Sequence, residues 1–153
     1  MKIEKLIEIL KEKKMTIAVV ESCSGGYTSY LLTKTKGSSK VFKGAIIAYS
    51  LEAKNKFFKI PFNFLNKTKG VSEKIALILA KKIRNIFNSD IGLSIVGFAG
   101  PNSRRGVKVG TVFIGLAKKN YIESKKIIIE GERNYIRKKV SLISIKLIYD
   151  MIK

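Results

Sequence analysis

The chain has 153 residues with 46% hydrophobic content, which is enough for a single domain, residues 1–153, with a buried core. It contains no histidine, which excludes Ser-His-Asp and Cys-His catalysis and histidine metal sites. The single cysteine, Cys23, also excludes an intrachain disulfide and a structural zinc site. We therefore expect no metal and no cofactor, and any catalysis must use other side chains or backbone groups.

The formal net charge is +20, from 31 Lys and Arg residues against 11 Asp and Glu residues. A charge of this size favours non-specific, salt-sensitive binding to polyanions. The basic residues are mostly lysines spread over almost every segment, so they do not indicate one dedicated nucleic-acid surface. The lone cysteine, with no long apolar run and no signal peptide, predicts a cytoplasmic protein that does not enter a membrane.

Hydrophobic spacing predicts alternating helices and strands in the first half of the chain. The expected elements are an amphipathic helix over 2–13, a strand over 15–20, a helix from Gly26 to before Thr35, a strand over 43–49, and a short helix over 52–58. Residues 61–69 are expected to be irregular.

The second half continues the alternation. Ser72 is expected to cap a helix whose apolar positions run to Ile86. Strands are expected over 91–96, 109–117 and 125–130. A final helix is expected over 134–152, with Val140, Ile143, Leu147 and Met151 on its apolar side.

Three of the expected strands are continuous apolar runs, which indicates a sheet covered on both faces and therefore an α/β sandwich. Ligands of such folds bind in loops beyond the carboxyl ends of the strands. Polar turns follow each of the first three strands, and they converge only if those strands are parallel neighbours.

The turn after the first strand, Glu21-Ser22-Cys23-Ser24-Gly25-Gly26, has the composition of a small-molecule site. Its glycines let the backbone approach a ligand closely, and the helix that follows points unpaired N–H groups toward the strand end. The same turn supplies two hydroxyls and one carboxylate. The alternative is an ordinary strand-to-helix turn without a ligand.

Several segments, in order along the chain, together resemble one known family. Residues 21–26 resemble its Glu-Ser-Cys-Thr-Gly-Gly, residues 48–54 its Ala-Tyr-Ser-Asn-Glu-Ala-Lys, and residues 97–101 its Gly-Ile-Ala-Gly-Pro. Residues 70–73, 109–112 and 131–137 add shorter matches. The family is that of the CinA C-terminal domain, whose characterised members are nicotinamide-nucleotide amidases.

The resemblance implies a three-layer α/β/α sandwich with a mixed, mostly parallel sheet. It also implies hydrolysis of the amide of nicotinamide mononucleotide to nicotinate mononucleotide and ammonia, in pyridine-nucleotide salvage. The link to competence and DNA damage in the family's name is a weaker implication.

Amide hydrolysis requires a nucleophile, a base and donors to the developing oxyanion. Without histidine, a serine–lysine pair is the simplest arrangement, because a buried lysine has a lowered pKa. We expect Ser22 to be the nucleophile, Lys54 its base, and Tyr49 a proton relay or orienting group. Ser24 is the second candidate nucleophile. Backbone N–H groups of Ser24, Gly25 and Gly26 are expected to hold the oxyanion or the substrate phosphate.

Further substrate contacts are expected from the neighbouring turns. Glu21 is expected to bind ribose hydroxyls, or else to pair with a nearby lysine. Arg133 and Arg137 are four residues apart and are expected to clamp the phosphate, or else to form a solvated helix face. Gly97 and Gly100 form the turn after the third strand and are expected to contact the substrate. Thr111 either offers its hydroxyl to the site or is an ordinary strand residue.

The chain departs from the family pattern at three places. Leu51 stands where Asn is usual, Ser24 stands where Thr is usual, and the loop over 101–108 is shorter and more basic than usual. Two other functions remain open: a non-catalytic nucleotide-binding or regulatory module of the same fold, in which the loop changes have ended turnover, and a basic DNA-associated competence- or damage-related protein, which the net charge of +20 suggests. The expected partner is a small-molecule pyridine nucleotide, and we expect a homo-oligomer, with a dimer favoured.

Overall fold

The structure, a computed structural model, describes residues 3–153, so Lys2 of the first expected helix lies outside the described residues. The helices are α1 (Ile3–Glu12), α2 (Tyr27–Thr33), α3 (Leu51–Phe58), α4 (Phe62–Thr68), α5 (Glu73–Ile86) and α6 (Arg133–Ile152), with a 3₁₀ turn at Ser38–Lys40. The strands are β1 (Ile17–Glu21), β2 (Phe42–Ile47), β3 (Ile91–Gly97), β4 (Thr111–Lys118) and β5 (Tyr121–Ile128).

The strands form one sheet in the order β2-β1-β3-β4-β5. β1 pairs in parallel with β2 and with β3, whereas β4 is antiparallel to both β3 and β5. Four strands therefore run in one direction, and β4 alone opposes them. Because β1, β2 and β3 are parallel neighbours, the turns that follow them meet at one edge of the sheet. This is the condition under which the three polar turns were expected to converge.

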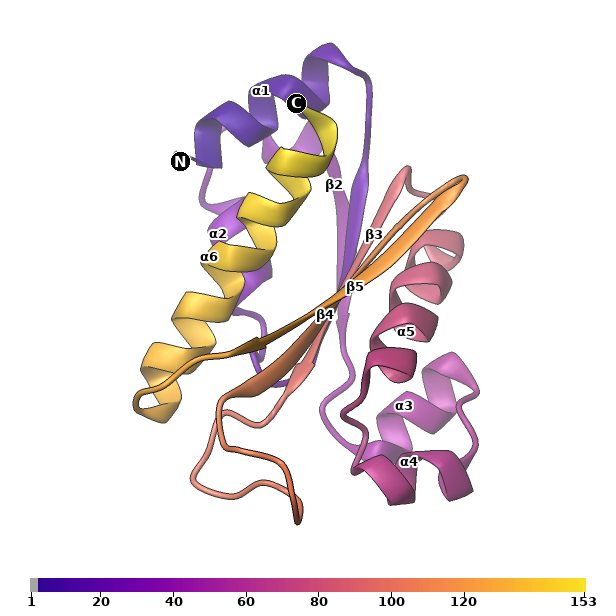
Figure 1. The fold of residues 1–153 in the computed structure, drawn as a ribbon. Coiled ribbons are helices and arrows are strands. Elements are labelled where there is room, and N and C mark those ends of the chain that lie inside the picture. Colours follow the sequence, from indigo (N-terminus) through magenta and orange to yellow (C-terminus); the bar gives the residue numbers. More distant parts are fainter. Residues whose placement is uncertain (1–2) are drawn as a thin grey trace.

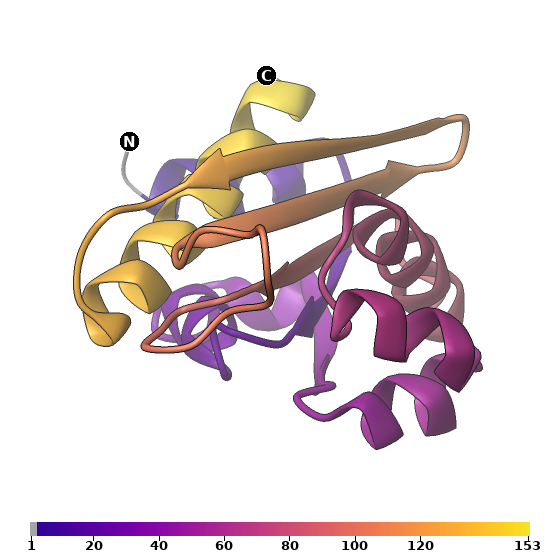
Figure 2. The ribbon, with the colours of Figure 1, turned by 60° about the horizontal axis from the view of Figure 1, so that its bottom comes forward.

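Helices cover both faces of this sheet, which makes the fold a three-layer α/β/α sandwich (Figure 1). α1, α2 and α6 lie on one face, and α3, α4 and α5 lie on the other; Figure 2 shows the same layers from a second direction. Two buried clusters fill the space between the layers, one under each set of helices. β1 is shared between them, because Ile17 and Val19 belong to the first cluster and Ala18 and Val20 to the second.

Two expected elements are corrected by the structure. Residues 61–69 are not irregular, because α4 begins after Pro61 and buries Leu65 against the second cluster. Its Asn and Thr residues have weak helix propensity, so tertiary packing stabilises a helix that local sequence does not indicate. β5 begins at Tyr121, before the expected residue 125, because a tight hairpin pairs Lys118 with Tyr121. This strand lies at the sheet edge, so its polar residues remain exposed and hide the pattern.

The buried face of α6 is also different from the expected one. Of the four residues expected on its apolar side, only Val140 is fully buried, and the other three pack at the edge of the core. The buried face instead consists of Ile136, Val140, Ile145, Ile148 and Ile152 with two serines among them. The Ser141 hydroxyl donates to the carbonyl of Arg137 at 2.9 Å, and the Ser144 hydroxyl donates to that of Val140 at 2.8 Å. These bonds within the helix satisfy both hydroxyls, so a buried face can contain polar residues.

No helix within residues 3–153 has both the length and the apolar character needed to cross a membrane.

Candidate active site

A cavity of about 210 Å³ lies where the carboxyl ends of β1, β2 and β3 meet. Residues from five segments line it: Ser22 and Cys23 after β1; Tyr49 and Lys54 after β2; Lys69 and Val71 between α4 and α5; Gly97, Phe98, Ala99, Gly100 and Asn102 after β3; and Arg133 at the start of α6. The parallel pairing of the three strands therefore brings together residues that are far apart in the sequence.

Ser22 and Lys54 are the central pair of this cavity. The Lys54 Nζ lies 3.1 Å from the Ser22 Oγ, within hydrogen-bond distance. Ser22 is held in place from the sheet, because its backbone N–H donates to the carbonyl of Ile95 at 3.0 Å. Lys54 is held by α3, whose N-cap is Ser50: the Ser50 hydroxyl accepts from the N–H of Ala53 at 3.0 Å.

Lys54 is 2% exposed, and its other hydrogen bonds reach only backbone carbonyls. Its Nζ donates to the carbonyl of Ala48 at 2.7 Å and to that of Tyr49 at 3.4 Å. Among the described residues no carboxylate lies within salt-bridge distance of it. Burial without a counter-ion lowers the pKa of Lys54 from 10.5 to about 8. A substantial fraction of the amine is therefore neutral near physiological pH.

Glu21 does not line the cavity, which corrects the expected ribose contact. It is completely buried, and its two carboxylate oxygens accept from the N–H groups of Gly26, Thr28 and Ser29 and from the Ser29 hydroxyl, at 2.6 to 3.1 Å. Glu21 therefore occupies the N-terminus of α2. Of the three N–H groups that we expected to receive a ligand, that of Gly26 is bound to the Glu21 carboxylate and that of Gly25 donates to the carbonyl of Ser22 at 3.0 Å, whereas that of Ser24 has no backbone acceptor among the described residues. The expected lysine partner for Glu21 is likewise absent from its described hydrogen bonds.

The other two polar groups of the turn after β1 are also buried. Ser24 is fully buried, does not line the cavity, and its hydroxyl has no hydrogen-bond partner among the described residues. Cys23 lines the cavity, but burial raises the pKa of its thiol to about 12, so it is neutral at physiological pH. Of the three side chains in this turn, only that of Ser22 combines access to the cavity with a contact to a candidate base.

Tyr49 contributes through two different groups. Its backbone carbonyl accepts from Lys54, whereas its side chain is 59% exposed and its hydroxyl accepts from Arg133 Nη2 at 2.7 Å. The phenol makes no described hydrogen bond to Ser22 or Lys54. The geometry therefore fits an orienting group better than a proton relay. Arg133 also donates to the carbonyl of Gly100, so it joins the turns after β2 and β3.

The remaining predicted residues divide between the cavity and its surroundings. Gly97 and Gly100 line the cavity; an added Cβ at Gly97 would approach the Thr111 carbonyl to 2.8 Å. Arg137, one turn beyond Arg133, does not line the cavity and donates instead to the carbonyl of Ser24 at 3.2 Å. Thr111 is buried at the start of β4 and is not a lining residue, so the expected hydroxyl contact is corrected.

Gly25 and Gly26 do not line the cavity; they form the turn that follows the lining residues Ser22 and Cys23. Both have positive φ, at +57° and +93°, a conformation that favours glycine. An added Cβ at Gly25 would approach the guanidinium of Arg137 to 3.1 Å. Glycine is therefore needed at Gly25 for the turn and for the Arg137 contact, and neither glycine is a lining residue of the cavity.

The sequence analysis missed the segment that links α4 to α5. Lys69 lines the cavity, and an added Cβ at Gly70 would lie 3.2 Å from the Lys54 side chain, so the Gly70 backbone packs directly on that lysine. Asn102 also lines the cavity from the loop after β3. Two signals were available: the Lys-Gly pair at the end of a segment that we expected to be irregular, and the family match over residues 70–73, to which we had given no role in the site.

The fold and the site together define a three-layer α/β domain with a serine–lysine pair at the carboxyl edge of its sheet. A family model described as the CinA C-terminal domain matches residues 2–152, and the chain belongs to this family. A CinA-like protein of Dictyoglomus turgidum is 40% identical over 135 residues, which cover 88% of this chain and 33% of that protein. A CinA-like protein of Dictyoglomus thermophilum is 37% identical over the same shares of both chains.

Solved structures have the same fold. A competence or damage-inducible protein from Enterobacter asburiae superposes with a TM-score of 0.93 at 24% identity, covering 99% of this chain and 96% of that one. A competence/damage inducible protein from Agrobacterium tumefaciens gives a TM-score of 0.92 at 22% identity, covering 100% and 97%. The chain covers nearly the whole of these two solved chains, but it spans only about a third of the length of the curated relatives that it matches.

Proposed function

We propose that this domain is an amidohydrolase that converts nicotinamide mononucleotide to nicotinate mononucleotide and ammonia. The observation that carries the proposal is the buried Lys54 amine, which has no carboxylate partner and lies 3.1 Å from the Ser22 hydroxyl inside a cavity. Family membership supports the same reaction through the resemblance described above.

The three hydrogen-bond neighbours of Lys54 can be satisfied by the protonated amine, which donates to all three, and also by the neutral amine. A neutral amine has two N–H donors and one lone pair, and Lys54 has two carbonyl acceptors, on Ala48 and Tyr49, and one hydroxyl neighbour, Ser22. In the neutral form, with both N–H groups donating to the carbonyls, the lone pair of Lys54 is left for the Ser22 hydroxyl. Lys54 can then accept the proton of that hydroxyl as Ser22 attacks.

In the first half of the proposed reaction, Ser22 Oγ forms a bond to the amide carbon of the substrate while its proton passes to Lys54 Nζ. The N–H group of Cys23, a lining residue of the cavity, has no backbone acceptor among the described residues and is the proposed donor to the oxyanion. The tetrahedral intermediate breaks its C–N bond, and Lys54 returns the proton to the departing ammonia. In the second half, Lys54 takes a proton from a water that attacks the ester carbon, and it returns this proton to Ser22 Oγ as the C–O bond to Ser22 breaks and nicotinate mononucleotide leaves.

Arg133 is the proposed phosphate contact. It lines the cavity and has no carboxylate partner among the described residues, although it also donates to the Gly100 carbonyl and the Tyr49 hydroxyl, whereas Arg137 does not line the cavity. The ring of Tyr49, held by Arg133 at the same opening, is available to the pyridine ring.

The test is ammonia release from nicotinamide mononucleotide by the purified protein, with nicotinate mononucleotide measured by chromatography. We expect wild type and Ser24→Ala to release ammonia and Ser22→Ala to release none above background. Ammonia from Ser22→Ala but not from Ser24→Ala would move the nucleophile to Ser24. No ammonia from wild type would contradict the amidase, and a nucleotide-induced rise in Tm without product would then indicate a binding module of the same fold.

A further inference from the structure

The ionisable side chains that line the candidate cavity include basic residues and no acidic residue. Three of its lining side chains are basic, namely Lys54, Lys69 and Arg133, and none of its lining residues is acidic. Lys54 is buried beside Ser22, whereas Lys69 and Arg133 are exposed at the opening. Within residues 3–153 neither of these two exposed cations has a carboxylate within salt-bridge distance. An opening with two cations and no acid selects for an anionic substrate.

Lys69 is held at this opening by its backbone. It is the C-cap of α4, with φ of +49° and its N–H donating to the carbonyls of Asn66 and Leu65. This left-handed conformation is unfavourable for a residue with a Cβ. The next residue, Gly70, packs on the Lys54 side chain, so the turn that positions Lys69 is fixed against the proposed base.

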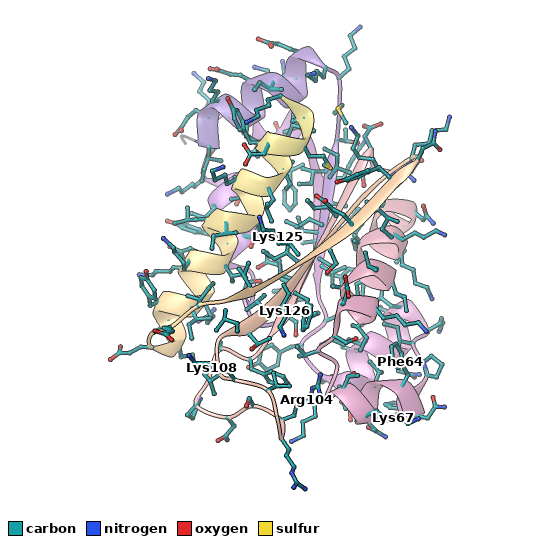
Figure 3. The ribbon with its side chains drawn as sticks, in the orientation of Figure 1. Phe64, Lys67, Arg104, Lys108, Lys125 and Lys126 are labelled. Carbon is teal, nitrogen blue, oxygen red and sulfur yellow. The ribbon has the colours of Figure 1, made fainter. Side chains whose placement is uncertain are left out.

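The basic loop after β3 contacts the segment between α4 and α5 that contains Lys69. Arg104 Nη2 donates to the carbonyl of Val71 at 3.4 Å, and Asn102 of that loop is a lining residue of the same cavity as Lys69. Figure 3 shows Arg104 on this loop at the same end of the molecule as α4, which carries Lys67. The loop that departs from the family pattern is therefore in contact with the segment that presents Lys69.

We propose that Lys69 is a specificity residue that, with Arg133, binds the phosphate monoester of the substrate. Lys69 approaches from the layer of α3, α4 and α5, and Arg133 approaches from the layer of α6 on the other face of the sheet (Figure 1). The two cations thus hold the phosphate from both sides of the sheet edge. This inference rests on the proposed function for its substrate, but its test does not require turnover.

The experiment compares Lys69→Met with Lys67→Met by titration calorimetry. Lys67 is exposed, lies two residues earlier on α4 and does not line the cavity, so its variant removes the same charge without touching the site. The probes are ribose 5-phosphate, ribose and inorganic phosphate. We expect the Kd for ribose 5-phosphate to rise about tenfold in Lys69→Met, the loss of one charge-assisted hydrogen bond, and to stay within twofold of wild type in Lys67→Met.

Each result decides the proposal. Recovery of affinity in Lys69→Arg would support it, because arginine restores the charge. Equal affinities in Lys69→Met and Lys67→Met would overturn it. Inorganic phosphate that binds as tightly as ribose 5-phosphate would overturn recognition of a phosphate monoester. Because binding is measured directly, a Lys69-dependent Kd in a protein without amidase activity would support this inference and refute only the proposed function.

Discussion

Glu21 and Lys54 are both buried at the carboxyl edge of the sheet, but their surroundings are opposite. Glu21 accepts four hydrogen bonds from the first turn of α2 and has no access to the cavity. Lys54 has no carboxylate partner, contacts two backbone carbonyls and one hydroxyl, and lines the cavity. A fully hydrogen-bonded buried charge stabilises the fold, whereas an amine that is buried without a counter-ion has a lowered pKa and can act as a base.

The alternation of side chains along β1 separates these two environments. Val19 and Glu21 point toward α2 and α6, and Val20 points toward α3 and α5. Ser22 continues this alternation and meets Lys54 on α3. Two consecutive residues, Glu21 and Ser22, therefore belong to different layers of the molecule. Removing one should affect folding, and removing the other should affect chemistry.

The largest expected effect is on turnover. Lys54→Met removes the proposed base, and we expect kcat for nicotinamide mononucleotide to fall about 10³-fold. In wild type the neutral amine is the active form, so the rate should rise about tenfold per pH unit below the pKa of about 8 and level off above it. The measurement is kcat/KM from pH 6 to 9.5. A rate that is flat across pH 8 would contradict the role of Lys54.

The next effect is on stability at Glu21. Glu21→Gln keeps the shape of the side chain but places an amide N–H₂ against donor groups of α2, and we expect the free energy of unfolding to fall by about 4 kcal/mol. Urea denaturation measures this loss. Glu52→Gln, at an exposed position in the first turn of α3, is the matched control. A loss of less than 1 kcal/mol in the free energy of unfolding, together with a raised KM, would contradict the structural role and would indicate that Glu21 binds the ribose of the substrate.

A somewhat smaller effect concerns the burial of Lys54 itself. Its pKa is about 8 in the folded state and 10.5 as the ordinary value, so between these values the unfolded chain binds more protons and stability rises with pH. The free energy of unfolding of wild type, measured against Lys54→Met, should increase by about 3 kcal/mol from pH 8 to pH 10.5. Lys56→Met, on the exposed side of α3, is the control for general charge effects. A difference that does not change with pH would contradict this prediction.

The smallest effect is expected at Ser24. Its buried hydroxyl has no partner among the described residues, so Ser24→Ala removes an unsatisfied polar group and should stabilise the protein by about 1 kcal/mol. Thermal unfolding, followed by circular dichroism, checks the sign. A destabilisation of more than 1 kcal/mol would mean that the hydroxyl has a partner, for example a water molecule, that the contacts described above do not include.

Much of the site could be predicted because local pattern and topology agree. The polar turns after the first three strands indicated a shared site if those strands were parallel neighbours, and the sheet order confirms that they are. The roles of Ser22 and Lys54 stay predictions, but their 3.1 Å separation is the distance that those roles require. Arg133 and Arg137 could not be separated in advance, because the direction of α6 decides that only the first reaches the cavity.

The sequence by itself determined the alternation of helices and strands, the serine–lysine chemistry left by the absence of histidine, and membership of the family. Only the tertiary structure decided which polar groups face the cavity and which stabilise the fold. Glu21 was assigned to the substrate but binds α2, and Lys69 was passed over but lines the opening. The physical reason is that a side chain's role depends on neighbours contributed by distant segments, and local spacing carries no information about those neighbours.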